Sequence, residues 1–296
     1  MSSPFFSIII PTYNREDTIL STIESVISQD YIDFEIIVVD DGSTDSTSLN
    51  VKSIVDNRLK YFKKKNEERA IARNYGVKKA KGKYITFLDS DDILYPQFLS
   101  TAFKLLKSHN FPEWAHLAYE IKTRDNKIIR RENNRVGRIN QSLIYGNHLS
   151  CIGVVIRNEI IKTHKFNTDR SVIGSEDYLL WLELASKYEL VYSNNISAYM
   201  LQHEKRSVIN FNKEQLIERI EAVIRYALKN VNINKFLGDK MNTFIAYRYL
   251  YLCNHLSRSN NKKESFTYFI KALKHYPNAI LARQSLSYIK SIFILE

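Results

Sequence analysis

The 296-residue sequence lacks an apolar run long enough to cross a bilayer, which takes roughly 18 or more consecutive apolar residues. The N-terminal segment MSSPFFSIIIP lacks the basic start and the small-residue cleavage site of a signal peptide, so we expect a cytoplasmic protein. Two cysteines, Cys151 and Cys253, are present without a CxxC spacing. Neither a disulfide framework nor a zinc site is therefore predicted.

The composition is that of a globular protein, with 44% hydrophobic and 25% charged residues. The net charge of +11 is unevenly distributed, because residues 211–296 hold 14 basic and 6 acidic side chains, a local charge of +8. This excess favours an anionic partner such as a membrane surface, although a basic helical face exposed to water explains it equally well. The sequence contains no recognisable RNA- or DNA-binding motif, and we expect no nucleic-acid partner.

Apolar residues alternate between strand-like and helix-like periods in the first half of the chain. Strands are predicted at Phe6–Ile10, Phe34–Val39, Arg58–Phe62 and Tyr84–Leu88, with helices between them. Asn14 and Asp17 are a candidate capping pair for the first helix. Such alternation is typical of an α/β protein with a parallel sheet covered by helices on both faces.

After residue 110 the pattern favours a mixed continuation of the sheet, and from about residue 211 it is entirely helical. We therefore predict a Rossmann-like mixed sheet flanked by helices in residues 1–210 and an all-helical C-terminal appendage in residues 211–296. In the appendage, Phe266, Phe269, Ile270 and Leu273 have helical spacing and are predicted to be buried.

Three polar clusters, PTYN, DDGSTD and DSDD, each come directly after a predicted strand. Ligands of such sheets bind at the carboxyl ends of the strands, so the three clusters should share one rim. The rim carries Asp40 and Asp41, which can accept hydrogen bonds from a base or a ribose. It also carries Asp89-Ser90-Asp91, whose hard oxygen ligands suit Mg²⁺ or Mn²⁺.

The acidic turn needs a compensating partner, because like charges this close disfavour the ionised state. A bound cation is one solution, but acidic turns are common and many bind no metal. Arg69 and Arg73, in the nearby segment ERAIARN, can pair with a phosphate or a base. Equally, either arginine can simply neutralise the rim.

Four segments resemble, in order, the successive motifs of the family-two glycosyltransferases: SIIIPTYNRED, IIVVDDGSTD, ARNYGVKKAKGKYITFLDSDD and GSEDYLLWLELA. The resemblance covers roughly residues 5–207 and implies the GT-A fold of nucleotide-diphospho-sugar transferases. It implies that the base pocket is lined by Pro11, Thr12 and Tyr13. Asp40 would accept from the base, and Arg69 or Arg73 would close over it.

The same resemblance implies that Asp89 faces the ribose and that Asp91 binds the divalent cation. Asp177 would be the catalytic base, with Glu176 contacting the acceptor or the donor sugar. The segment YMLQHEKRS resembles the family's closing segment, in which His203 would add a metal ligand and Arg206 or Ser207 would reach a phosphate. Met200 and Gln202 stand where the family usually has a basic residue, so His203 is equally interpretable as a loop histidine.

The function implied is an inverting transfer of a sugar from a nucleotide-diphosphate donor, a UDP-sugar in our interpretation, to a hydroxyl of a glycan or lipid-linked acceptor. Mn²⁺ or Mg²⁺ would stabilise the leaving diphosphate, and a carboxylate would take the proton of the attacking hydroxyl. We expect a role in bacterial surface polysaccharide biosynthesis.

Two alternatives remain at this point. The segment ITFLDSDDI also fits the strand and Asp-x-Asp turn that open haloacid-dehalogenase-type phosphatases, although here two strand-helix units precede it. A catalytically inactive subunit that binds nucleotide-sugars is the second alternative. A dinucleotide-binding oxidoreductase is excluded, because PTYNRED has no glycine where the Gly-x-Gly-x-x-Gly motif is needed.

We predict that the basic appendage docks on the catalytic domain and offers a basic face to a partner or to anionic lipid at the inner face of the cell membrane. The segment from Ala246 to Ile280 resembles one tetratricopeptide-type helical pair, which cannot bury both of its faces alone. Each basic residue near an anionic surface contributes about 1 kcal/mol. Salt-sensitive co-sedimentation with anionic but not neutral vesicles, lost on deleting residues 211–296, is expected. Absence of binding at low salt would show that the lysines are merely solvated.

Overall fold

The structure is a computed structural model that describes residues 3–133, 139–202 and 212–293. The chain forms two compact units. Unit 1 comprises Met1–Ile139, Leu149–Thr168 and Tyr188–Arg206, and unit 2 comprises Asn140–His148, Asp169–Lys187 and Ser207–Glu296. The described residues after 211 all belong to unit 2, which also takes two segments from within residues 1–210. A functional domain boundary at residue 210 stays a prediction.

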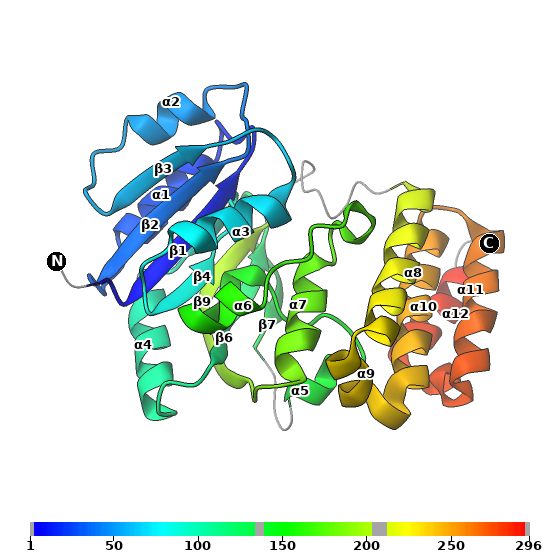
Figure 1. The fold of residues 1–296 in the computed structure, drawn as a ribbon. Helices are drawn as coiled ribbons and strands as arrows, with labels where there is room; N and C mark the ends of the chain where they lie inside the picture. Colours follow the sequence, from blue (N-terminus) through cyan, green and yellow to red (C-terminus); the bar gives the residue numbers. More distant parts are fainter. Residues whose placement is uncertain (1–2, 134–138, 203–211, 294–296) are drawn as a thin grey trace. The chain divides into compact units, whose positions relative to one another are not determined.

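Unit 1 is built on a nine-stranded sheet with the order β3-β2-β1-β4-β8-β6-β9-β5, and β7 pairs with β6 (Figure 1). The strands are β1 (Phe6–Thr12), β2 (Phe34–Asp40), β3 (Leu59–Lys63), β4 (Tyr84–Phe87), β5 (Asp92–Leu94), β6 (Trp114–Lys122), β7 (Ile128–Glu132), β8 (Val154–Arg157) and β9 (Val191–Leu201). β3, β2, β1 and β4 are parallel, whereas β8 is antiparallel to both β4 and β6. The predicted mixed sheet is therefore confirmed.

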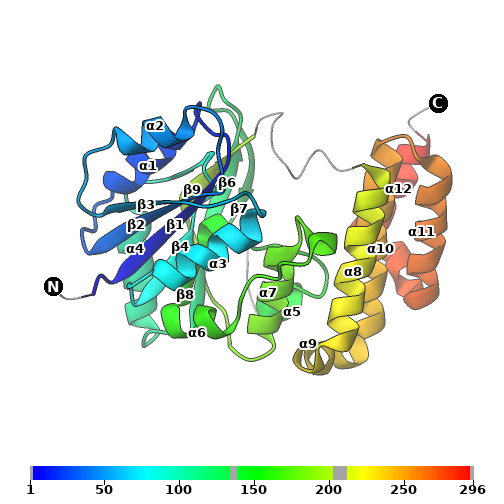
Figure 2. The ribbon, with the colours of Figure 1, turned by 45° about the horizontal axis from the view of Figure 1, so that its top comes forward.

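Both faces of the parallel strands are covered (Figure 2). The helices are α1 (Ile19–Ile27), α2 (Thr47–Lys52), α3 (Arg69–Lys79), α4 (Phe98–Ser108) and α6 (Asn158–Thr163). Ile8 of β1 belongs to a buried cluster with residues of α1 and α4, while its neighbour Ile9 contacts the opposite helix, α3, at Gly76. This alternation follows from the period of two along a strand and explains why β1 is apolar on both faces.

The predicted capping pair Asn14–Asp17 is wrong. The residue before α1 is Thr18, and Asn14 has a positive φ of 49°. The Asn14 side-chain oxygen accepts from the backbone N–H of Thr44 at 2.9 Å, and its own N–H donates to the Ser43 hydroxyl at 3.0 Å. Asn14 therefore joins the loops after β1 and β2, because these contacts across the rim replace the local cap.

Unit 2 is helical in its described residues. With the short α5 (Ile139–Ser142) at its border, it contains α7 (Glu176–Ala185), α8 (Lys213–Lys229), α9 (Val231–Leu237), α10 (Met241–Arg258), α11 (Lys262–His275) and α12 (Arg283–Phe293). Helices α10 and α11 pack against each other along most of their length (Figures 1 and 2), which confirms the predicted helical pair.

The predicted apolar stripe of α11 is partly wrong. Phe269 is buried, but Phe266 is 55% exposed. The buried side chains of this helix are instead Ser265, Tyr268, Phe269 and Ala272. The Ser265 hydroxyl donates to the Cys253 carbonyl of α10 at 2.8 Å, so the hydroxyl rather than a phenylalanine faces the partner helix.

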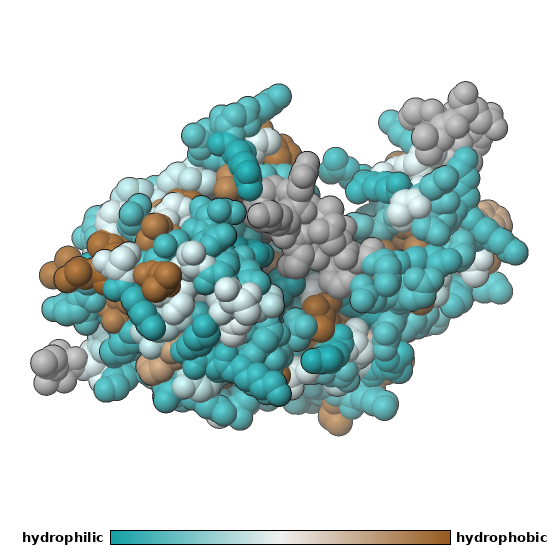
Figure 3. All heavy atoms as spheres, turned by 90° about the horizontal axis from the view of Figure 1, so that it is seen from above, coloured by the Kyte–Doolittle hydropathy of each residue, from teal (hydrophilic) through white to brown (hydrophobic). Residues whose placement is uncertain are grey.

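Apolar side chains on the surface are scattered (Figure 3). Exposed examples in unit 1 include Ile32, Leu49 and Val55. Single exposed apolar residues are normal on globular proteins. No helix within the described part of the chain combines the length and the apolar character needed to cross a membrane.

Glu35 holds together the start of the parallel strands. Its buried carboxylate accepts from the Ser7 hydroxyl at 2.7 Å, from Lys60 Nζ at 2.6 Å and from the Lys81 backbone N–H at 2.6 Å. Burial alone would raise its pKa, but these three donors outweigh burial and lower the pKa below the ordinary value. The ionised form thus stabilises the fold above the unfolded pKa, and this contribution is lost as pH falls through the folded pKa.

We predict that Glu35→Gln lowers the free energy of unfolding by about 1 to 3 kcal/mol at pH 7, because hydrogen bonds to a buried charge are lost. The difference between variant and wild type should shrink below pH 4. Urea unfolding across pH 3–8 measures both quantities, and Glu24→Gln, at an exposed position of α1, is the control. A pH-independent difference would show that the charge of Glu35 does not matter.

Candidate functional site

The loops after β1 and β2 meet at one end of the sheet. Thr12, the last residue of β1, pairs in register with Asp40, the last residue of β2. The backbone N–H of Asp41 donates to the Thr12 carbonyl at 2.8 Å. Pro11 and Thr12 are buried, whereas Tyr13 is 45% exposed and presents a ring to solvent. The predicted rim therefore exists, and Tyr13 is the residue of PTYN best placed to stack on a base.

Asp40 is fully buried, and both of its carboxylate oxygens have protein donors. One oxygen accepts from the Ser43 backbone N–H at 2.7 Å, and the other accepts from the Tyr61 hydroxyl. Burial and the neighbouring Asp40 raise the pKa of Tyr61 to about 12, so Tyr61 stays a donor. A carboxylate has about four lone-pair positions, so these two donors do not use all of its acceptor capacity. Contact between Asp40 and a nucleotide base stays a prediction.

Asp41 organises the loop that leads into α3. Its carboxylate accepts from Lys64 Nζ at 2.6 Å and from the backbone N–H groups of Glu67 and Glu68, the latter at 2.9 Å. Glu68 precedes α3 with a positive φ of 85°, a conformation that costs about 1 to 3 kcal/mol for a non-glycine residue. Asp41 thus stabilises the turn from which Arg69 and Arg73 follow.

Arg73 and Asp89 form a short ion pair on the rim. Arg73 Nη2 lies 2.6 Å from Asp89 Oδ1, and the arginine side chain is only 2% exposed. Its guanidinium also lies 5.3 Å from the centre of the Phe166 ring. This geometry agrees with the interpretation that Arg73 neutralises the rim. Arg69 lies one turn earlier on α3 and is half-buried.

The remaining carboxylates of the acidic turn have different neighbours. The backbone N–H of Asp92 closes the turn on the Asp89 carbonyl at 3.0 Å. Asp92 is buried at the start of β5, and its side chain accepts from the Leu201 backbone N–H at 3.2 Å. Asp91 lies 3.6 Å from Arg15 Nε, and the Thr18 hydroxyl donates to the Ser90 carbonyl at 2.8 Å. The turn is thereby anchored to the segment after β1.

Arg15 is a site residue that our sequence analysis missed, although it lies within PTYNRED. Its position four residues after Pro11 placed it on the same rim, which was a usable signal. Within residues 3–133, 139–202 and 212–293, no group of three or more metal-binding side chains is present. The predicted ligand His203 and the predicted phosphate contacts Arg206 and Ser207 lie outside the described residues.

Glu176 and Asp177 occupy the first turn of α7, directly after Ser175 at the N-cap position. Carboxylates are stabilised there by the helix dipole. Glu176 is buried and accepts from the Gly174 backbone N–H at 2.6 Å, a contact that the positive φ of Gly174, 84°, makes possible. Asp177 is half-exposed and accepts from Asn147 Nδ2 at 3.2 Å. Of the two carboxylates, Asp177 is therefore more open to a substrate.

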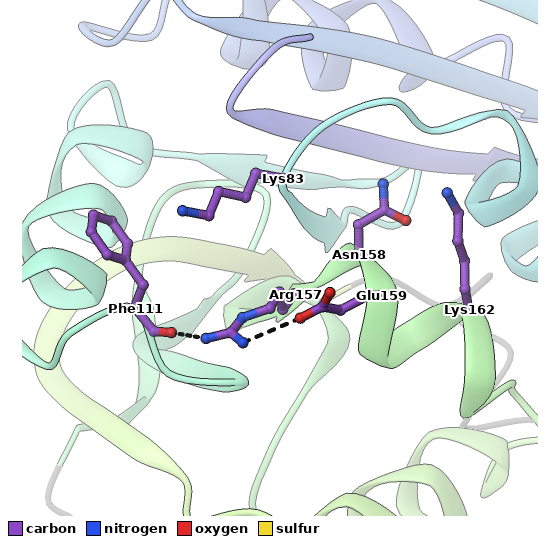
Figure 4. Close-up of a pocket in the computed structure, with 6 residues that line it drawn as sticks. All are labelled: Lys83, Phe111, Arg157, Asn158, Glu159 and Lys162. Atoms are coloured by element: carbon purple, nitrogen blue, oxygen red, sulfur yellow. Dashed lines mark hydrogen bonds and ion pairs between the residues drawn. The ribbon is translucent and has the colours of Figure 1, made fainter.

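A separate cavity of about 520 Å³ in unit 1 is lined by Lys83, Phe111, Arg157, Asn158, Glu159 and Lys162 (Figure 4). Lys83 immediately precedes β4, and Arg157 pairs with Tyr84 at the same end of that strand. Asp89 follows the opposite end of β4. The cavity therefore lies at the end of the parallel strands where ligands of such sheets do not usually bind.

Sequence comparisons identify the family. The sequence model described as glycosyl transferase family 2 matches residues 7–153. An uncharacterized glycosyltransferase of Haemophilus influenzae is 34% identical over 68% of this chain and 80% of its own length. The chain belongs to glycosyl transferase family 2. A further relative, the Escherichia coli UDP-Glc:alpha-D-GlcNAc-diphosphoundecaprenol beta-1,3-glucosyltransferase WfaP, is 31% identical over 84% of this chain and 93% of its own length.

Other relatives of this family-2 chain are much longer. An uncharacterized glycosyltransferase of Rickettsia bellii is 31% identical over 81% of this chain but only 35% of its own length. The chain thus spans about a third of this relative.

Solved structures show the fold. TarS of S. aureus, crystallised as residues 1–349 with UDP-GlcNAc, superposes with a TM-score of 0.71 at 22% identity, over 97% of this chain and 88% of that one. A mannosyltransferase of Pyrobaculum calidifontis, in complex with GDP-Man and Mn²⁺, has a TM-score of 0.58 at 15% identity, over 99% and 87%. The GT-A fold predicted from the sequence is confirmed.

Proposed function

We propose that this protein transfers a sugar from a UDP-sugar to a hydroxyl of a lipid-linked glycan acceptor, with inversion, in surface polysaccharide biosynthesis. The observation that carries the proposal is the convergence of Asp40, Asp89 and Asp91 at the carboxyl ends of β2 and β4, the two strands that pair in parallel with β1. The relatives supply the substrate class, since WfaP is named for a UDP-glucose donor and a diphosphoundecaprenol-linked acceptor.

Membership of glycosyl transferase family 2 removes the haloacid-dehalogenase alternative. In those phosphatases the Asp-x-Asp strand opens the domain, whereas here β4 lies inside the sheet beside β1. A subunit that only binds nucleotide-sugars stays an alternative, and donor hydrolysis or transfer by the purified protein distinguishes the two.

The donor set of the rim suits Mg²⁺ or Mn²⁺. Asp91, the second aspartate of the Asp-x-Asp turn, would bind the cation, while Asp89 pairs with Arg73 and Asp92 accepts a backbone N–H. A single carboxylate together with substrate phosphates is a common way to hold such an ion. When bound, the cation would offset the charge of the leaving diphosphate. Arg15, 3.6 Å from Asp91, would add positive charge beside it.

The chain's own residues would perform the remaining work. Tyr13 would stack on the nucleotide base, and Asp40 would accept from it. Asp177, oriented by Asn147, would take the proton of the acceptor hydroxyl as the hydroxyl attacks the anomeric carbon. Glu176, whose carboxylate is held by the Gly174 N–H, would contact a sugar.

We predict that Asp91→Ala abolishes the Mn²⁺-dependent part of UDP binding, because the cation loses its protein ligand. Calorimetric titration of UDP with and without Mn²⁺ measures this. The matched control is Asp30→Ala, which removes an exposed carboxylate just beyond the C-terminal end of α1. If UDP binding to the Asp91 variant still responds to Mn²⁺, another residue holds the metal.

We predict that Asp177→Asn lowers turnover by a factor on the order of 10² to 10⁴, the range for loss of a positioned base. Affinity for UDP should change little, because the substitution leaves the rim of unit 1 intact. Product formation followed by mass spectrometry measures turnover, and Glu176→Gln is the parallel variant. If the turnover of Asp177→Asn stays within a few-fold of wild type, Asp177 is not the base and Glu176 becomes the first candidate.

A further inference from the structure

Arg248 of α10 is a buried cation in unit 2 that the proposed mechanism does not use. The residue is 6% exposed, and no described carboxylate lies within ion-pair distance of it. Its Nε has no hydrogen-bond partner in the described structure. An arginine stays charged at any physiological pH, and a buried charge without a counter-ion is costly.

Aromatic rings compensate part of this cost. The guanidinium carbon lies 4.8 Å from the centre of the Tyr178 ring and 5.2 Å from that of Phe244. Burial raises the pKa of Tyr178 to about 12, with Arg248 acting in the opposite direction, so the phenol stays neutral. Ring faces attract a cation, and the Tyr178 hydroxyl is a side-chain hydrogen-bond partner of Arg248, but a guanidinium carries five N–H donors and one phenol oxygen cannot accept from all of them.

The segment 143–148 connects Arg248 to the proposed base. The Tyr178 hydroxyl donates to the Leu143 carbonyl, and the Tyr145 ring packs edge-on against Tyr247, with centroids 4.9 Å apart. Asn147 of the same segment donates to Asp177. All of these residues belong to unit 2. The segment 143–148 therefore contacts the neighbours of Arg248 through Leu143 and Tyr145, and it contacts Asp177 through Asn147.

Gly146 forms a corner between two nitrogen-bearing side chains. A Cβ at this position would lie 3.3 Å from His148 Cε1, 3.7 Å from Arg248 Nη2 and 3.7 Å from His148 Nε2. Its φ is not in the left-handed region, so the backbone does not demand glycine here. Gly146 is half-exposed and Asn147 is exposed, so the corner opens to solvent. The absence of a side chain at this position therefore brings the half-exposed backbone close to both nitrogens.

We propose that Arg248, His148 and the corner at Gly146 form a subsite for a phosphate group of the acceptor, next to the base Asp177. The inference rests on the proposed function. It adds that the protein binds the acceptor through the diphosphate group attached to the acceptor sugar. A guanidinium binds phosphate oxygens through two parallel N–H donors, so a phosphate would add oxygen acceptors beyond the Tyr178 hydroxyl. The donor's phosphates are assigned to unit 1, whereas this corner shares unit 2 with the base.

The test compares two synthetic acceptors that carry the same sugar, one linked through a diphosphate to a short alkyl chain and one an alkyl glycoside without phosphate. Arg248→Met should lower kcat/KM for the diphosphate acceptor about 10- to 100-fold, mainly through KM, because a charge-assisted contact is lost. The phosphate-free acceptor should be affected less than about threefold. Arg248→Lys should recover part of the loss, since it keeps the charge but not the paired donors.

Two further variants separate binding from folding. Arg258→Met removes an exposed arginine of the same helix and should behave as wild type. Gly146→Glu places a carboxylate beside Arg248 and His148, and it should reproduce the selective loss. Gly146→Gln, of the same size but neutral, should do so much less. Thermal denaturation of each variant shows that the fold is retained.

Calorimetric titration of the diphosphate acceptor without donor gives a readout that does not depend on turnover. Binding to wild type that is lost in Arg248→Met and Gly146→Glu supports the subsite, even if no transfer is detected and the proposed function fails. Equal losses with both acceptors, or unchanged diphosphate binding in Gly146→Glu, would overturn the inference. Arg248 would then be a structural clamp on Tyr178.

Discussion

The parallel pairing of β1 with β2 on one side and with β4 on the other is the constraint on which the rim depends. Thr12 is opposite Asp40 in this register, and the N–H of Leu88, after β4, donates to the Ile9 carbonyl at 3.0 Å. A slip of one residue would turn the buried side chains of a strand to the other face, so the register is strongly specified. The polar residues that follow β1, β2 and β4 consequently lie at the same edge of the sheet.

Once the carboxylates are gathered there, their charge is divided among partners. The Asp41 carboxylate accepts hydrogen bonds from Lys64 and from two backbone N–H groups. Asp89 forms an ion pair with Arg73, and Asp92 accepts from a backbone N–H of β9. Asp91 has Arg15 at a longer distance of 3.6 Å. The protein therefore stabilises most of its acidic rim without a ligand. Asp91 is the carboxylate that we assign to the metal.

Unit 2 uses the opposite arrangement, a buried cation near a half-exposed carboxylate. Arg248 is held by ring faces, and Asp177 is held by one amide and by the start of its helix. Removing either partner of a buried charge contact is usually destabilising, whereas a bound anion would satisfy the guanidinium. This is why the diphosphate of an acceptor fits the corner at Gly146 better than a neutral sugar does.

The sequence by itself determined the strand-helix alternation and the polar clusters after β1, β2 and β4, because a strand's period of two and the turn residues are local signals. It also indicated the helical pair α10–α11. Only the tertiary structure decided which partner each polar residue has. Asn14 joins two loops instead of capping α1, Arg73 binds Asp89, and Phe266 faces solvent while Ser265 faces α10. The reason is physical: periodicity is a local signal, whereas the final burial of a side chain and its hydrogen bonds and ion pairs with residues distant in sequence depend on how the elements pack.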